Sequence, residues 1–334
     1  MKKIFIRSPY FLEISEVDQV GSKVELYFYN SGSSVPTEPT HVLNRSVVSE
    51  SQFETFYNIS NYAKGYIKPI APLDIEGIGI ENVKNWCYVL VKTFKETSVG
   101  VFVLIEEFTL VCLNGYSSFL DGYNYSSDAQ VLPLLDTSIN LTVVEYGTTY
   151  ANVFFEVGVY DFETSEATET ITVTEPNLYK IPLNSLDNYV DTYFYINNVR
   201  EVCENIYTPI TCKYINRLGG WQFLTFFKAS SEALSFKGSD FNMLPSSVIY
   251  NPLQGQKRVF NKQGTLTVKC NTGWVDENYK ELIQDLFLSD VLLLDNKPVI
   301  LKSTSFESKT KLKNNNINYE LEFEYNYGLM NDVI

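Results

Sequence analysis

Apolar and polar positions alternate strictly near the end of the sequence, where residues 318–327 read NYELEFEYNY. Alternation with a period of two predicts a half-buried strand, with the aromatic and aliphatic side chains on the core face. Upstream, lysines alternate with Thr310 and Leu312, and the three asparagines at 314–316 are turn residues. We therefore predict a closing hairpin over 305–327 that carries an ion ladder of Lys309, Lys311, Lys313, Glu320, Glu322 and Glu324. A metal or acid–base site is the alternative interpretation, but catalytic carboxylates usually come from separate elements around a pocket.

Residues 1–115 have the pattern of an N-terminal β-sandwich domain. Residues 23–30 alternate between apolar and polar positions, and Gly21 with Ser22 predicts a turn that joins them to the preceding segment as a hairpin. Near-continuous apolar runs at 85–94 and 101–113 predict two strands buried on both faces and connected near Gly100. Helical spacing over 59–67 predicts one short helix, with Ser60 as its cap.

Residues 116–136 are polar, rich in tyrosine and without periodicity, which predicts a linker or loop between domains. Aromatic side chains are favoured at protein interfaces, so Tyr116, Tyr123 and Tyr125 are interface candidates. Oxygen ligands for calcium are available at 121–128, from Asp121, Asn124 and Asp128. The spacing lacks the glycine and the final glutamate of an EF-hand loop, so an ordered loop is the favoured interpretation.

The rest of the chain predicts a middle β segment at 137–200 and a C-terminal β domain at 201–334. The middle segment has alternating stretches typical of an antiparallel sandwich or meander, at 138–147, 152–162, 169–177 and 191–199. In the C-terminal domain a strand pattern runs into Gly219 and Gly220, followed by Trp221, a large anchor and a further interface candidate. Residues 276–289 carry an apolar stripe at helical spacing. The fold class is therefore mainly β, with multi-domain antiparallel β-sandwiches and one C-terminal helix packed on a sheet.

Composition narrows the classes of function that the chain could have. The length of 334 residues predicts two or three domains, and 24 tyrosines with 22 phenylalanines suit half-buried sheets. A net charge of −14 argues against specific nucleic-acid binding, since holding duplex DNA by its phosphates needs clustered cations. The first apolar run is too short for a secretion signal, and no stretch is long enough for a membrane span. The five cysteines are interpreted as buried free thiols of a reducing cytoplasm: Cys87, Cys112, Cys203, Cys212 and Cys270.

No group of residues points to chemistry. His41 is the single histidine and lies beside a proline loop. The sequence contains no nucleophile elbow whose serine or cysteine it could activate. No CxxC spacing supports a zinc site, and Gly219-Gly220 lacks the GK[ST] of a phosphate loop. We therefore expect no catalytic residue, no cofactor and no metal. The sequence favours a binding or assembly protein over an enzyme.

Two segments carry a resemblance to a known family. They are CKYINRLGGWQFLTFFK at 212–228, and LIQDLFLSDVLLL at 282–294 with the closing hairpin that follows. They resemble virion structural proteins of tailed phages that infect gut Bacteroidetes, notably the crAss-like phages. The N-terminal stretches SPYFLEI, GSKVELYFYN and PTEPTHVLN resemble the opening β-domain of such tail proteins. The middle segment is not covered by the resemblance.

The resemblance implies a structural virion protein of the tail or neck, either a ring protein or a tail hub. The expected partners are a homo-oligomeric ring of six or twelve copies and other tail, portal or ring proteins. The expected location is the virion, after assembly in the host cytoplasm. The acidic chain would then line a channel from which DNA phosphates are repelled. The alternative is a tail-associated module that binds host-surface glycans through exposed tyrosine, tryptophan and asparagine.

Overall fold

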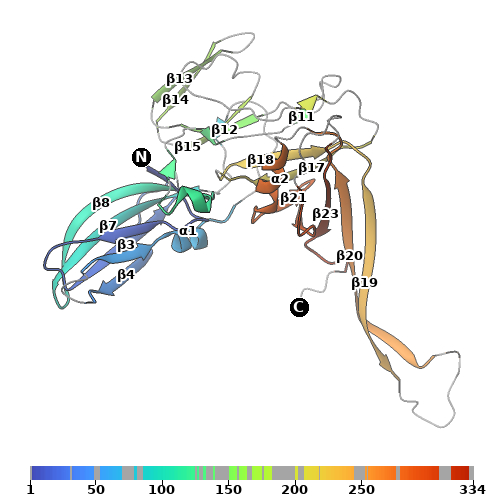
Figure 1. Cartoon of the computed structure of the whole chain (residues 1–334), viewed down its shortest axis with the longest axis horizontal. Coiled ribbons are helices and arrows are strands. Elements are labelled where there is room, and N and C mark those ends of the chain that lie inside the picture. Colours follow the sequence, from blue (N-terminus) through green and yellow to red (C-terminus); the bar gives the residue numbers. More distant parts are fainter. Residues whose placement is uncertain are drawn as a thin grey trace.

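The structure is a computed structural model, and it is mainly β, as the alternating patterns predict. Its strands form two large sheets, one in each half of the chain, with a group of shorter strands above them (Figure 1). The described residues are 2–30, 32–48, 53–69, 79–80, 86–124, 126–127, 131–132, 138–139, 150–155, 158–163, 168–174, 177–182, 200–201, 207–217, 219–243, 253, 255–275, 279–307 and 317–330.

The N-terminal lobe is built on a six-stranded sheet. Its strands, in spatial order, are β4 (His41–Ser46), β3 (Gly21–Tyr29), β7 (Trp86–Ser98), β8 (Val101–Leu113), β1 (Lys2–Phe5) and β9 (Ser126–Ser127). The neighbours are antiparallel except β1 and β8, which are parallel. The turn between β7 and β8 lies at Val99 and Gly100, as predicted, and Gly100 has the positive φ of 80° that such a turn favours.

A second layer covers one face of this sheet. It consists of the two-stranded ribbon of β2 (Phe11–Ile14) with β5 (Thr55–Asn58) and of helix α1 (Ser60–Tyr66). Their apolar side chains, including Leu12, Tyr57 and Ala63, share one buried cluster with Leu26 and Val89 of the sheet. The core of this lobe therefore lies between two layers.

Three details of this lobe differ from the sequence prediction. The segment before Gly21 forms no hairpin with β3, because β2 pairs with β5 while β3 pairs with β4 and β7. Ile59 occupies the N-cap of α1, and Ser60 lies in the first turn with its hydroxyl donating to the Ser8 carbonyl oxygen. The apolar run at 101–105 is largely exposed rather than buried, because β8 extends beyond the second layer.

The middle segment contributes short strands. β12 (Tyr150–Phe155) lies between β10 (Val131–Leu132) and β15 (Asn177–Pro182), and β6 (Gly79–Ile80) completes that sheet. β13 (Gly158–Glu163) and β14 (Thr168–Val173) form an antiparallel pair, and β11 (Ser138–Ile139) lies parallel to β16 (Arg200–Glu201). The predicted single strand at 152–162 is thus two strands in two sheets.

The C-terminal lobe is a seven-stranded antiparallel sheet with helix α2 (Tyr279–Phe287) on one face. The strands, in spatial order, are β18 (Trp221–Phe226), β17 (Ile210–Ile215), β21 (Leu292–Leu294), β22 (Lys297–Leu301), β23 (Glu320–Tyr325), β20 (Lys257–Asn271) and β19 (Ser231–Asn242). The predicted apolar stripe of α2 is confirmed, because Tyr279, Leu282, Ile283 and Leu286 are buried in the same cluster as Leu321 and Phe323 of β23.

The alternation in β23 is confirmed, but its partner differs from the predicted one. Leu321 and Phe323 face the core, and the glutamates face outward. β23 pairs with β22 on one edge and with β20 on the other, with Leu301 opposite Phe323. The hairpin therefore opens at Lys297 rather than at 305. The predicted lysines Lys309, Lys311 and Lys313 lie outside the described residues.

Candidate functional site

The two large sheets are joined by a buried apolar cluster that contains residues of both lobes. Phe5, Trp86, Tyr88, Val111 and Leu113 come from the N-terminal lobe, and Ile215 and Trp221 come from the C-terminal lobe. Trp221 has an exposed fraction of 0%. This interface candidate therefore packs between two lobes of its own chain and offers no surface to a neighbouring protein.

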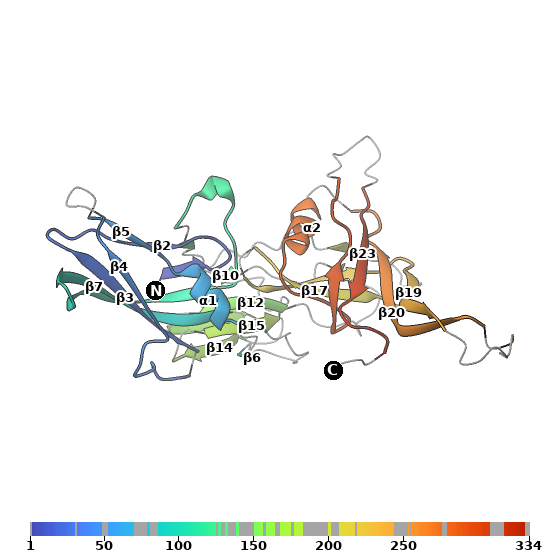
Figure 2. The ribbon, with the colours of Figure 1, turned by 90° about the horizontal axis from the view of Figure 1, so that it is seen from below.

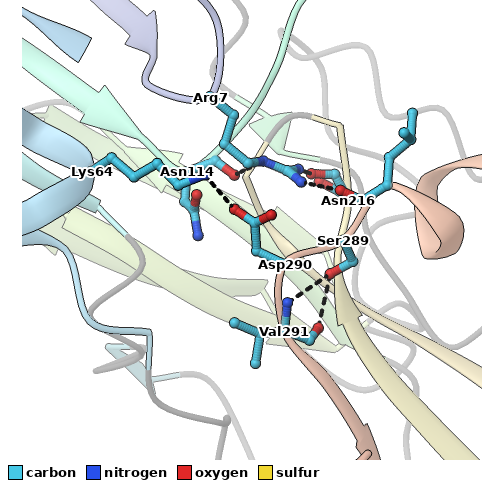
Figure 3. Close-up of polar contacts among 8 residues, drawn as sticks. Arg7, Lys64, Asn114, Asn216, Ser289, Asp290 and Val291 are labelled. Carbon is cyan, nitrogen blue, oxygen red and sulfur yellow. Dashed lines mark hydrogen bonds and ion pairs between the residues drawn. The ribbon is translucent and has the colours of Figure 1, made fainter. Parts of the chain in front are cut away.

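Arg7 connects both lobes at the edge of this cluster (Figure 3). Arg7 follows β1 in the sequence. Its guanidinium donates to three carbonyl oxygens: those of Asn114 (3.1 Å), Asn216 (2.9 Å) and Leu288 (2.6 Å). Burial lowers the pKa of Arg7, and the nearby Asp290 opposes that effect. Because an arginine remains protonated in proteins, these are charge-assisted hydrogen bonds, which are stronger than neutral ones.

Tyr116 continues this polar network on the other side of Arg7. The Arg7 guanidinium lies 4.9 Å from the centre of the Tyr116 ring, and the Tyr116 hydroxyl donates to a carboxylate oxygen of Asp285 (2.7 Å). The second oxygen of Asp285 accepts the backbone N–H of Arg217 (3.1 Å), whose own carbonyl accepts the N–H of Tyr116 (2.7 Å). Tyr116 is thus an interface residue within the chain.

We expect Tyr116→Phe to destabilise the fold by about 1–2 kcal/mol at neutral pH, because a half-buried carboxylate loses a donor. Burial raises the pKa of Asp285 above its ordinary value, and the Tyr116 hydroxyl opposes that rise. Without the hydroxyl the pKa of Asp285 rises further. The destabilisation should therefore be small below the raised pKa of Asp285 in the parent chain, where the carboxyl is protonated in both proteins, and grow as the pH rises through that pKa.

Urea denaturation of Tyr116→Phe across this pH range measures the effect. Tyr123→Phe is the matched control, because the Tyr123 side chain is 71% exposed and its loss of a hydroxyl should change little. A destabilisation by Tyr116→Phe that is the same at all pH values would mean that Asp285 does not depend on this hydrogen bond.

The loop that follows uses its oxygen atoms for local structure. Asp121 accepts the N–H of Ser118 (2.7 Å) at the start of a short 3₁₀ turn (Phe119–Asp121) and forms an ion pair with Arg217 (2.5 Å). The Asn124 amide accepts the N–H of Phe11 (2.5 Å) and donates to its carbonyl oxygen (2.8 Å). Two of the residues considered as calcium ligands are therefore engaged in folding the loop. Asp128 and the interface candidate Tyr125 lie outside the described residues.

Tyr123 is the one predicted interface aromatic in this loop that the structure describes as exposed. Its ring packs edge-to-face on Phe11, with 6.0 Å between ring centres. Within the described ranges no group of three or more histidine, cysteine, aspartate or glutamate side chains could hold a metal ion. The loop thus exposes Tyr123 together with Phe119 and Leu120, neither of which was an interface candidate.

The carboxylates of β23 are paired with lysines other than the predicted ones. Glu322 lies 3.6 Å from Lys269 of β20 and 3.7 Å from Lys302, which follows β22, and Glu324 lies 3.4 Å from Lys302. These pairs are partly exposed, and exposed ion pairs contribute about 0–1 kcal/mol each. In the part of the sheet that the structure describes, these glutamates face the surface and are paired with lysines.

One surface that the sequence did not predict is a projecting hairpin. β19 and the first half of β20 leave the C-terminal sheet and extend away from both lobes (Figure 1). We call residues 231–243 with 255–262 the arm. In the arm nearly every side chain is exposed, including Leu234, Phe236, Phe241, Val259 and Phe260.

A bulge divides the arm. The register between β19 and β20 shifts after Lys237, where Gly238 lies beside Val259 and Asn261 has a positive φ of 47°. Bulges bend a strand pair, and this one separates the base of the arm from its distal part. In that distal part the rings of Phe241 and Phe260 pack edge-to-face, 5.7 Å apart.

The sequence contained a signal for the arm. Apolar and polar residues alternate with a period of two over 234–237 in the arm and over 265–270 in the part of β20 that stays in the sheet. Alternation predicts a strand but does not tell whether its apolar side meets a core in the same chain. The exposure of the arm could therefore be learned only from the structure.

The other residues considered for a functional role are His41 and the cysteines, and the packing of the fold accounts for those that the structure describes. The His41 ring lies 4.9 Å from that of Tyr62 and 6.0 Å from that of Phe28, which places it in an aromatic contact. Cys87, Cys112, Cys212 and Cys270 are free and buried, as predicted, while Cys203 lies outside the described residues. Among the described residues no helix has the length and apolarity needed to cross a membrane.

Comparison with protein-family models, with curated proteins and with solved structures finds no match for this chain. Its function must therefore be inferred from the surfaces described above.

Proposed function

We propose that this chain is a structural protein of a tailed-phage virion, assembled as a ring in the tail or in the head-to-tail connector through which DNA passes. The proposal rests on the resemblance of 212–228 and of the C-terminal segments to such proteins, and on one structural observation. That observation is the arm, which exposes phenylalanine rings far from any core of its own chain. Exposed apolar patches on proteins mark interaction surfaces.

The junction between the lobes supports the same proposal. A ring subunit must transmit load without changing shape, and a junction with a shared apolar cluster around Trp221 and the hydrogen bonds of Arg7 suits that task. The acidic chain suits a channel wall from which phosphates are repelled. In this proposal the protein carries no catalytic site, and its partners are its own copies and adjacent virion proteins.

The glycan-binding alternative has lost two of its four aromatic candidates. Trp221 and Tyr116 are engaged between the lobes, so they cannot stack on a sugar. Tyr123 remains exposed, but a glycan site generally needs several convergent groups in a concavity.

Sedimentation velocity and electron microscopy of the purified chain test the proposal. We expect a closed oligomer of six or twelve copies with a central opening. A chain that stays monomeric at every concentration tested, and that binds capsular polysaccharide, would instead support the glycan-binding module.

A further inference from the structure

Two exposed apolar surfaces lie at opposite ends of the molecule. The arm forms one end of the long axis, and the turn between β7 and β8 forms the other (Figure 2). Both views place them far apart, so the arm of a copy cannot reach the β7–β8 end of the same copy. Each surface needs a partner from outside the chain.

The arm is basic as well as apolar. It carries four cations, Lys237, Lys257, Arg258 and Lys262, against the two carboxylates Glu232 and Asp240. The rest of this chain is strongly acidic, since the whole has 26 lysines and arginines against 40 aspartates and glutamates. Among the described strands β19 pairs only with β20, so its outer edge carries backbone groups without a strand partner.

The distal part of β8 is the complementary surface. Val101, Val103, Leu104 and Ile105 are exposed there, followed by the exposed Glu106 and Glu107. Glu107 is also paired with Lys92 of β7 (3.0 Å), so Glu106 is the carboxylate of the two for which the structure shows no ion pair. β8 pairs with β1 only over Leu110–Leu113, so among the described strands residues 101–109 pair with β7 alone. We call residues 101–107 the β8 patch. It is apolar, acidic and lies at a strand edge.

We propose that the arm of one copy docks on the β8 patch of the next copy. Phenylalanine and valine side chains of the arm meet the valine, leucine and isoleucine side chains of the patch, and lysine and arginine meet Glu106 and Glu107. Opposite charges across an interface favour the correct partner and speed its encounter. Two free strand edges can also pair through their backbones.

The arrangement of the two surfaces determines the kind of assembly. Because they are different surfaces at opposite ends, the contact is heterologous, and repeating it generates a ring if the rotation closes. This inference rests on the proposed ring function and names the contact that would hold the ring together.

Three variants separate this contact from others. The first lacks residues 239–260, with Gly238 joined to Asn261, two residues that suit a tight turn. The second reverses the patch charges with Glu106→Lys and Glu107→Lys, and the third reverses the arm charges with Lys237→Glu and Arg258→Glu. The control for the third is Lys68→Glu with Lys280→Glu, which changes the net charge equally at exposed sites outside the arm.

Sedimentation velocity of each variant is expected to show loss of the oligomer for all three, while the control assembles like the parent chain. Mixing the arm-deleted and patch-reversed variants should give dimers that grow no further, because one donates an intact arm and the other an intact patch. Combining both charge reversals in one chain should restore the oligomer. The point variants keep the test valid even if the deletion misfolds.

Three outcomes would overturn the inference. If the parent chain forms rings and the arm-deleted, folded variant does so too, the ring proposal stands but this contact is wrong. If the patch-reversed variant still assembles, the arm contacts something other than Glu106 and Glu107. A parent chain that never assembles would overturn the ring proposal and this inference together.

Discussion

Replacing Trp221 with alanine is expected to lower the free energy of unfolding by about 3–5 kcal/mol, the range typical of a buried tryptophan or phenylalanine. The side chain is fully buried between the lobes, where it shares a cluster with Trp86, Tyr88 and Leu113. Truncation leaves a cavity that two rigid sheets cannot close. Urea denaturation followed by circular dichroism measures the loss.

Trp274→Ala is the matched control for this experiment. The Trp274 side chain is 58% exposed, so its removal should cost less than about 1 kcal/mol. Equal losses for the two variants would show that Trp221 does not anchor the lobes in solution.

Replacing Arg7 with alanine is expected to cost about 2–4 kcal/mol, because three carbonyl oxygens lose a charged donor at once. The variant should also unfold less cooperatively, since the hydrogen bonds to Asn216 and Leu288 join the N-terminal lobe to the C-terminal one. Fluorescence and circular dichroism should then report different urea midpoints, the sign of a populated intermediate.

Lys64→Ala provides the comparison at the same junction. Lys64 forms an ion pair with Asp290 (2.9 Å) in which both side chains are about half exposed (Figure 3). Such a pair contributes about 0–1 kcal/mol, so the variant should stay close to the parent. If Arg7→Ala unfolds in one transition at the parent midpoint, Arg7 does not couple the lobes.

Local sequence patterns were sufficient to predict the type of an element and its buried face where these depend on residues close together in the sequence. The alternation of 318–327 predicted a strand with Leu321 and Phe323 inward, and the stripe of 276–289 predicted a helix that packs on a sheet. Both predictions are confirmed, because a period of two or of 3.6 residues decides which side chains share a face.

The partners of these elements could not be predicted in the same way. The start of the closing hairpin was placed eight residues too late, because loop residues at 314–316 mark a turn but do not measure how far its strands extend. The run at 101–105 was predicted to be buried from its apolarity alone. Whether a second layer covers a strand depends on segments far away in the sequence.

The same limit applies to the candidate site. Trp221 and Tyr116 were predicted as candidates for an interface with a neighbouring protein, but both lie at contacts between the lobes of one chain. The sequence could not tell a neighbouring lobe from a neighbouring subunit. Arg7 was not singled out at all. Its partners follow it by 107, 209 and 281 residues, and no local pattern marks an arginine as the link between such distant carbonyls.

That separation along the chain has a consequence for synthesis on the ribosome. Translation proceeds at about 5–20 residues per second. Arg7 is therefore made roughly 15–60 seconds before Leu288, whose carbonyl accepts the last of its three hydrogen bonds. During this interval the aromatic side chains of Trp86 and Tyr88 lack the covering provided by Ile215 and Trp221. The nascent N-terminal lobe should therefore be a client of chaperones until its second half is made.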